Sequence, residues 1–240
     1  MLPKTKLPIH ELTLPSDGRK VKVRPFLVGE EKLLLMALES GEENDIINTT
    51  KQIINNCLID SDIDVDTLPF FDIDYLFIAL RAKSVGENID INFTCNHDDG
   101  NGICGATFPA QIDITKYRVI KDDTVKSEID LGGNILVLMK YPDYETMKRI
   151  NDDGTVLDKK INIIADSIEM VCEGEKVYSS KDINHKEIVE FVEGLTQSQF
   201  RKLEHFVDSF PSFVVTAEAT CDKCGFVHNL EYTDFTSFFV

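Results

Sequence analysis

The residues best suited to chemistry in this sequence are its cysteines, of which there are six. Four of them form two pairs. Cys95 and Cys104 lie in the middle of the chain, and Cys221 and Cys224 form a CxxC motif near its end. Structural Zn²⁺ is usually held by four ligands from two separated two-cysteine elements. The pattern therefore predicts one structural zinc site, with all four of these cysteines as ligands.

Neighbouring residues bear on the ligand set. Gly105 and Gly225 each follow a cysteine, and glycine can take the backbone angles that turn an amide toward a thiolate. The first cysteine pair is spaced more widely than in most zinc knuckles. His97 and His228 lie close enough in sequence to replace one thiolate. Two alternatives therefore stay open: three thiolates with one imidazole, or no metal.

Catalysis is not indicated by the motifs. A CxxC motif can be a redox dithiol, but it then sits at the start of a helix, whereas strands are expected on both sides here. Four thiolates leave no open position for a catalytic water, and the common nucleotide, protease and hydrolase motifs are absent from the sequence. Asp98-Asp99 and Asp152-Asp153 each precede glycine, which is typical of turns. We expect no enzyme; a hydrolase built on one acidic pair is the remaining catalytic alternative.

Two hairpins must position the cysteine pairs. Every second residue of an expected strand is apolar and lies on one face, as do Ile91, Phe93 and Cys95. After a loop rich in Asn, Asp and Gly, the chain is expected to continue as a second strand. A second pair of strands flanks the CxxC turn. We expect a zinc-ribbon-like pair of knuckles, formed by residues 88–114 and 212–233, that joins the mid-chain and C-terminal hairpins.

The remaining elements mix helices with hairpins. Asp17-Gly18 indicates a tight turn in a hairpin over residues 12–27. Apolar spacing and capping residues predict the other elements, which are helices over 29–38, 46–58, 73–80, 156–166 and 188–195, helices starting near Pro142 and Thr196, and hairpins over 129–139 and 168–178. Helices and antiparallel hairpins in separate runs indicate the α+β class. The length fits a single domain over residues 1–240.

The charge of the chain excludes several kinds of partner. Its net charge is −17, and so acidic a surface repels phosphate backbones and anionic lipids. We therefore expect neither nucleic acid nor membrane as a partner, and no motif indicates a small-molecule substrate. The N-terminus lacks the pattern of a signal peptide, and the apolar run 33–38 is too short to span a bilayer. We expect the protein to stay in a cytosol.

Two further features lie outside the metal pattern. Cys57, on a helix face, and Cys172, in a β-like run, are expected to be buried thiols, as free cysteines usually are. Phe235, Phe238 and Phe239 make the C-terminus strongly aromatic. An apolar terminus of this kind is expected to dock on its own fold or on a partner.

Several short motifs occur in an order that resembles one protein family. They are Leu-Pro-Ser-Asp-Gly at 14–18, the stretch 74–86, the two cysteine pairs and Asp-Phe-Thr-Ser-Phe-Phe at 234–239. With these motifs the chain resembles, along nearly its whole length, the baseplate hub subunit and hub assembly proteins of T4-type tailed bacteriophages.

The resemblance implies a non-enzymatic role in tail assembly, as a component of the baseplate hub or as a factor that helps the hub form. The implied partners are other phage baseplate and tail proteins. The implied location is the cytoplasm of the infected bacterium during assembly, with the virion as a further possibility. The alternative is a general zinc-ribbon adaptor that bridges proteins and is not tied to the virion.

Overall fold

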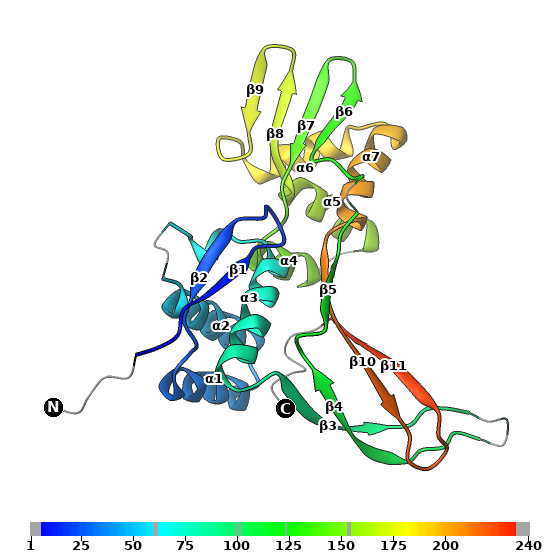
Figure 1. Cartoon of the computed structure of the whole chain (residues 1–240). Helices are drawn as coiled ribbons and strands as arrows, with labels where there is room; N and C mark the ends of the chain where they lie inside the picture. The colour runs from blue at the N-terminus through cyan, green and yellow to red at the C-terminus, as the bar shows by residue number, and fades with distance from the viewer. Residues whose placement is uncertain are drawn as a thin grey trace. The chain divides into compact units, whose positions relative to one another are not determined.

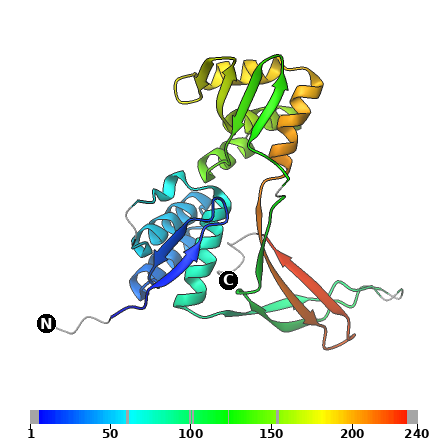
Figure 2. The same ribbon diagram turned by 45° about the horizontal axis from the view of Figure 1, so that its top comes forward.

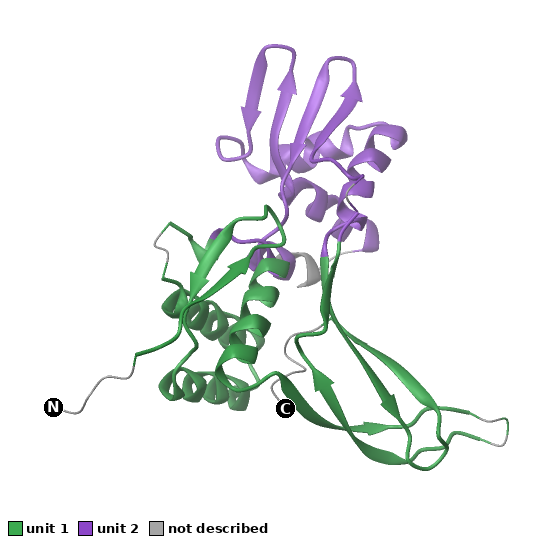
Figure 3. Cartoon of the chain, in the orientation of Figure 1, with its two compact units in different colours: residues 1–66, 71–120, 212–240 green, residues 67–70, 121–211 purple. Residues whose placement is uncertain are grey.

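The computed structural model describes residues 6–59, 62–98, 100, 102–122, 124–152 and 155–233. Contacts divide the chain into two compact units (Figure 3). Unit 1 comprises residues 1–66, 71–120 and 212–240, and unit 2 comprises residues 67–70 and 121–211. Units defined by contacts need not fold independently, so a single domain over residues 1–240 stays a prediction.

The N-terminal part of unit 1 is a hairpin followed by helices. Its elements are β1 (His10–Thr13), β2 (Lys20–Val23), α1 (Val28–Ser40), α2 (Glu43–Cys57), the 3-10 turn Val65–Thr67 and α3 (Phe70–Ser84) (Figure 1). Gly18 lies in the β1–β2 turn at φ 76°, where a side chain would be strained. Gly41 caps α1 in the left-handed conformation, with its N–H donating to the carbonyl of Leu38. The hairpin and the three helices confirm the predictions for this part of the chain.

One buried carboxylate ties the β1–β2 turn to α3. Asp72 is fully buried, and the backbone N–H and the hydroxyl of Ser16 both donate to its oxygens. Burial raises the pKa of Asp72 to about 6, although the Ser16 donors favour the charged form. An aspartate in an unfolded chain has a pKa of about 3.9. The folded protein therefore holds this proton more tightly than the unfolded chain does.

This difference predicts a pH-dependent loss of stability. Between about pH 4 and pH 6 the folded state binds more protons at Asp72, so raising the pH removes stability, by at most roughly 3 kcal/mol for a pKa difference of about 2. Asp72→Asn cannot ionise, so its stability should lack this dependence on pH. We expect the free energy of unfolding of the native protein to fall relative to that of Asp72→Asn as the pH rises through this window.

Urea unfolding of both proteins at pH 4, 5, 6 and 7 measures the difference directly. Asp45→Asn, which changes an exposed carboxylate on α2, serves as the control. Parallel stability curves for the native protein and Asp72→Asn would contradict the assignment.

The rest of unit 1 consists of strands that carry the cysteine pairs. They are β3 (Asn88–Thr94), β4 (Thr107–Asp113), β5 (Tyr117–Ile120), β10 (Ser212–Thr220) and β11 (Val227–Tyr232) (Figure 2). β3 pairs with β4, and β10 pairs with both β11 and β5, always antiparallel. The two hairpins lie where the alternation predicted them, whereas β5 was not predicted.

Unit 2 is a four-stranded antiparallel sheet with helices. Its elements are β6 (Glu128–Gly132), β7 (Ile135–Met139), α4 (Tyr144–Asp152), α5 (Val156–Asp166), β8 (Ile168–Glu173), β9 (Lys176–Ser179), α6 (His185–Glu193) and α7 (Gln197–Asp208). The strands follow the order β6-β7-β8-β9. Thr155 and Thr196 cap α5 and α7, each in a capping box. The cap at Thr196 confirms the predicted start of α7.

Helices and antiparallel hairpins occur in separate runs in both units, which confirms the predicted α+β class. Within the described ranges, no helix has both the length and the apolar character needed to cross a membrane. The aromatic residues at 235, 238 and 239 lie outside the described residues, so their docking stays a prediction.

Candidate metal centre

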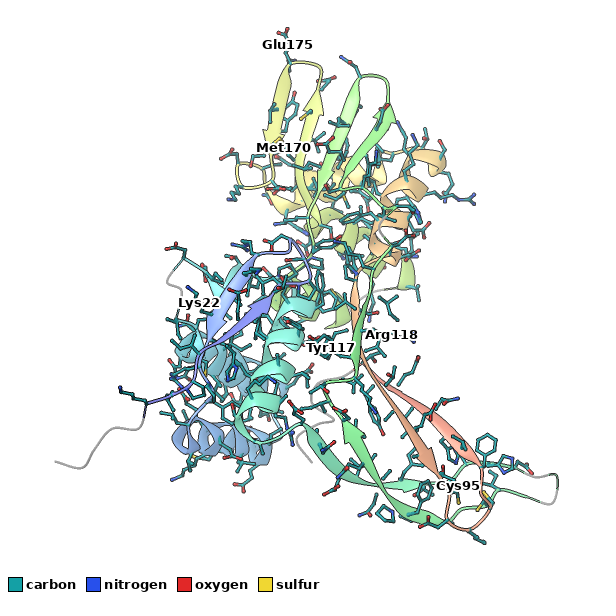
Figure 4. The ribbon with its side chains drawn as sticks, viewed as in Figure 1. Lys22, Cys95, Tyr117, Arg118, Met170 and Glu175 are labelled. Atoms are coloured by element: carbon teal, nitrogen blue, oxygen red, sulfur yellow. The ribbon has the colours of Figure 1, made fainter. Side chains whose placement is uncertain are left out.

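The four paired cysteines meet at one point in unit 1. Their sulfur atoms all lie within 4.8 Å of one another. The Sγ atoms of Cys95 and Cys224 are 3.6 Å apart, and those of Cys104 and Cys221 are 3.9 Å apart (Cys95 is labelled in Figure 4). A tetrahedral Zn²⁺ with Zn–S bonds of about 2.3 Å separates its sulfurs by about 3.8 Å. All four cysteines are free thiols, and their spacing fits a shared cation.

The backbone of the CxxC turn positions the second pair. The N–H of Cys221 donates to the carbonyl of Phe226 at 2.9 Å, which closes the end of the β10–β11 hairpin. The N–H of Gly225 donates to the carbonyl of Cys221 at 2.9 Å, with Gly225 at φ 72°. A residue with a side chain would be strained at this φ. The turn therefore depends on the glycine that follows the motif.

The first pair repeats this geometry despite its wider spacing. The N–H of Gly105 donates to the carbonyl of Cys95 at 3.0 Å, with Gly105 at φ 63°. The N–H of Cys104 donates to the carbonyl of His97 at 2.9 Å, and Asp98 and Ile103 form an isolated antiparallel β-bridge. The extra residues between the two cysteines thus extend the hairpin beyond the metal centre. Both ends of the loop still reach the same point.

Backbone amides and burial act on these thiols in opposite directions. Burial raises the pKa of Cys95 to about 12. Amide donors, first the N–H of Cys224 and then that of Lys223, lower the pKa of Cys221 to about 7. A cation bound by thiols deprotonates them, so buried sulfurs with amide donors are suited to hold a metal as thiolates.

A small apolar cluster surrounds the sulfurs. Phe108 and Ala219 are buried with Cys95 and Cys221, and Phe93 packs against them. Such a shell keeps water away from a metal site and raises the strength of its electrostatic interactions. Cys104 is half-buried and Cys224 is exposed, so the apolar shell covers mainly the other two sulfurs. Four soft sulfur donors suit Zn²⁺ better than Ca²⁺ or Mg²⁺, which prefer oxygen.

The two histidines lie beside the cysteine cluster. His228 is buried, and its Nε2 lies 3.2 Å from the Sγ of Cys95. His97 stacks on Phe226, with ring centroids 4.0 Å apart. Among the described residues, the four sulfurs are the one group of three or more candidate ligand atoms that all lie within 4.8 Å of one another. This arrangement favours four thiolates, with His228 as a neighbour of one sulfur.

The other residues singled out in the sequence lie elsewhere or serve the fold. Cys57 is buried as expected, but Cys172 is only half-buried on β8, so the prediction of a buried thiol is wrong there. Asp98 accepts the N–H groups of Gly100 and Gly102 at 2.9 and 3.3 Å, which confirms a turn. Asp99 and Asp153 lie outside the described residues.

Sequence reasoning missed two contributors to the site. The aromatic rings of Phe93 and Phe226 each approach His228 at 4.9 Å between centroids. Lys223, inside the CxxC motif, donates its Nζ to the carbonyl of Cys104 at 3.3 Å and so links the two knuckles. The lysine could have been noticed from its place inside the motif. Alternation places Phe93 on the face of Cys95, but the packing of both rings against His228 carries no local signal.

A family model described as T4 bacteriophage base plate protein matches residues 7–240, nearly the whole chain. Neither the curated proteins nor the solved structures contain a match to the chain. The matched range includes both cysteine pairs and all of unit 2. It confirms the resemblance seen in the short motifs at the level of the baseplate. The chain belongs to the family of T4 bacteriophage base plate proteins.

Proposed function

We propose that this protein is a non-enzymatic component of the phage baseplate that binds other tail proteins, with its shape fixed by a structural Zn²⁺. The observation that carries the proposal is the convergence of four sulfurs within 4.8 Å in a chain of a baseplate family. The ligands would be Cys95, Cys104, Cys221 and Cys224.

The ion would act as a staple between segments far apart in the sequence. Two of its sulfur pairs, at 3.6 and 3.9 Å, join residues 129 and 117 positions apart. Hairpin tips without a core of their own are marginally stable, so a metal that ties two tips together contributes its binding energy to folding. The resulting rigid end of unit 1 is a surface that other tail proteins can recognise without a large entropy cost.

The role within the baseplate is proposed as hub component or hub assembly factor. Both roles fit a protein that is made in the host cytoplasm and then either becomes part of the tail or helps the tail to assemble. We expect neither nucleic acid nor membrane among its partners, since the net charge of −17 repels phosphates. We also expect no small-molecule substrate, because no motif of the sequence indicates one. An adaptor for host proteins is the alternative role, and it would use the same zinc site.

A phage that lacks this protein tests the role. We expect tail assembly to stall before complete baseplates form, and the protein to co-sediment with tail proteins in infected cells. Complementation with the native chain should restore particles. Normal yields of intact tails without the protein would contradict the proposal, and stable complexes with host proteins alone would support the adaptor.

A further inference from the structure

The sheet of unit 2 has apolar side chains on both faces. One face packs on helices, as Val137 and Met139 lie in a buried cluster with residues of α5, α6 and α7 (Figure 1). A sheet that is apolar on both faces is typical of the middle layer of a three-layer arrangement. A second layer on the other face would complete such an arrangement.

Strand register defines the second face. Leu138 pairs with Met170, and Leu136 pairs with Cys172, which in turn pairs with Val177. Alternation along β7 places Leu136 and Leu138 opposite the buried Val137. The open face is defined by these five apolar side chains of β7, β8 and β9, which are Leu136, Leu138, Met170, Cys172 and Val177 (Met170 is labelled in Figure 4).

The row Leu136–Cys172–Val177 of the open face is accessible to solvent at both of its ends. Leu136 is 38% exposed and Val177 is 59% exposed, while Leu138, Met170 and Cys172 are half-buried. Five neighbouring apolar side chains in register form a continuous patch, unlike single exposed apolar residues, which need no explanation. Contiguous patches of this kind mark sites of interaction.

Charge specifies the kind of partner. Register places Glu128 opposite Leu138 and Asp130 opposite Leu136. The pairings give two rows across the sheet, Glu128–Leu138–Met170–Ser179 and Asp130–Leu136–Cys172–Val177. In these rows only Glu128 and Asp130 carry a charge, and both are exposed. The apolar patch thus has an acidic border along β6. A partner that fits it presents apolar side chains next to lysine or arginine.

A hollow at the turn end of the face suits a long basic side chain. It measures about 410 Å³ and includes Asp130, Leu136, Cys172 and the glycines of both turns among its lining residues. The stem of an arginine or lysine packs well on apolar side chains while its charged end reaches a carboxylate. The hollow and the acidic border therefore point to the same chemistry.

We propose that the open face docks an amphipathic helix of another tail protein, with lysine or arginine beside its apolar stripe. The inference rests on the proposed function, because it names the surface through which unit 2 meets the baseplate. The helix would form the third layer on the sheet. A second copy of this chain fits poorly, since it would bring a surface of net charge −17 against its own acidic border.

The test removes the apolar surface without changing charge. Full-length Leu136→Gln/Val177→Gln should co-sediment with tail assemblies from infected cells at least about tenfold less than the native chain, because central apolar contacts dominate such interfaces. Asp130→Asn should weaken association a few-fold and reduce its dependence on salt. Leu35→Gln/Met36→Gln, on α1 of unit 1, is the matched control, since these side chains are 51% and 56% exposed, and it should retain association.

A photo-reactive phenylalanine analogue at position 177 of the full chain identifies the partner. A crosslinked peptide from another tail protein, with basic residues beside a helical apolar stripe, supports the proposal. Crosslinks to a second copy, or full co-sedimentation of Leu136→Gln/Val177→Gln with an unchanged unfolding midpoint, overturn it. If the native chain itself fails to co-sediment with tails, the proposed function fails as well, so the two failures are distinguishable.

Discussion

Replacing Cys221 with serine is expected to abolish stoichiometric zinc binding and to lower the free energy of unfolding by about 4 kcal/mol or more. Cys221 is 1% exposed, and its sulfur lies 3.9 Å from that of Cys104. Serine keeps the shape of the side chain but replaces a soft thiolate with a hard hydroxyl, which Zn²⁺ binds poorly. The tips of the β3–β4 and β10–β11 hairpins, which this cluster joins, should then separate.

Elemental analysis and hydrogen exchange measure the two effects. The variant should contain little zinc, and its amides at 95–106 and 221–226 should exchange much faster than those of the native protein. Cys172→Ser is the matched control, because this half-buried thiol lies on β8 in unit 2 and is not one of the four clustered cysteines. A Cys221→Ser protein with a full complement of zinc, or loss of zinc in Cys172→Ser, would refute the ligand assignment.

Truncation of Phe213 should weaken the packing between the strands and the helix of unit 1. Phe213 on β10 is 4% exposed, and its ring lies 5.1 Å from that of Tyr117 on β5 and 6.2 Å from that of Tyr75 on α3. The three rings join the strands to the helix. We expect Phe213→Ala to lose about 3–5 kcal/mol of unfolding free energy, as for other buried phenylalanines.

Denaturant unfolding checks this value. Tyr178→Ala removes an aromatic ring that is 41% exposed on β9 and should cost less than about 1 kcal/mol. Phe213→Ala should still bind zinc, since Phe213 is not among the residues that pack around the cysteine cluster. A loss below about 1 kcal/mol in Phe213→Ala would show that the aromatic group does not hold the strands and the helix together.

The site was predictable where its signals are local. Alternation places Phe93 and Cys95 on one face, and the CxxC spacing with Gly225 identifies a turn that needs a left-handed residue. Two such hairpin ends in one chain predict a shared metal, with His97 or His228 as possible replacements for one thiolate. The sequence therefore predicts that the four sulfurs lie close together, as they do.

Other features depend on tertiary contacts that carry no local signal. β5 is four residues long with no clear alternation, and it exists because Tyr117–Ile120 pairs with Ser212–Val215, far along the chain. Alternation along β8 places Cys172 on the opposite face of the sheet from Val171 and Glu173, but it does not reveal which face the helices cover. The open face and the half-buried Cys172 follow from that choice. Likewise, the shape of the loop between the first two cysteines depends on the bond from Cys104 to His97.

X-ray absorption of the purified full-length protein would identify the metal and its ligands. We expect one zinc per chain with four sulfur neighbours at about 2.3 Å, because the four sulfurs are spaced as around a tetrahedral ion. A metal-free folded protein, or a shell that contains nitrogen from His97 or His228 in place of one sulfur, would contradict it.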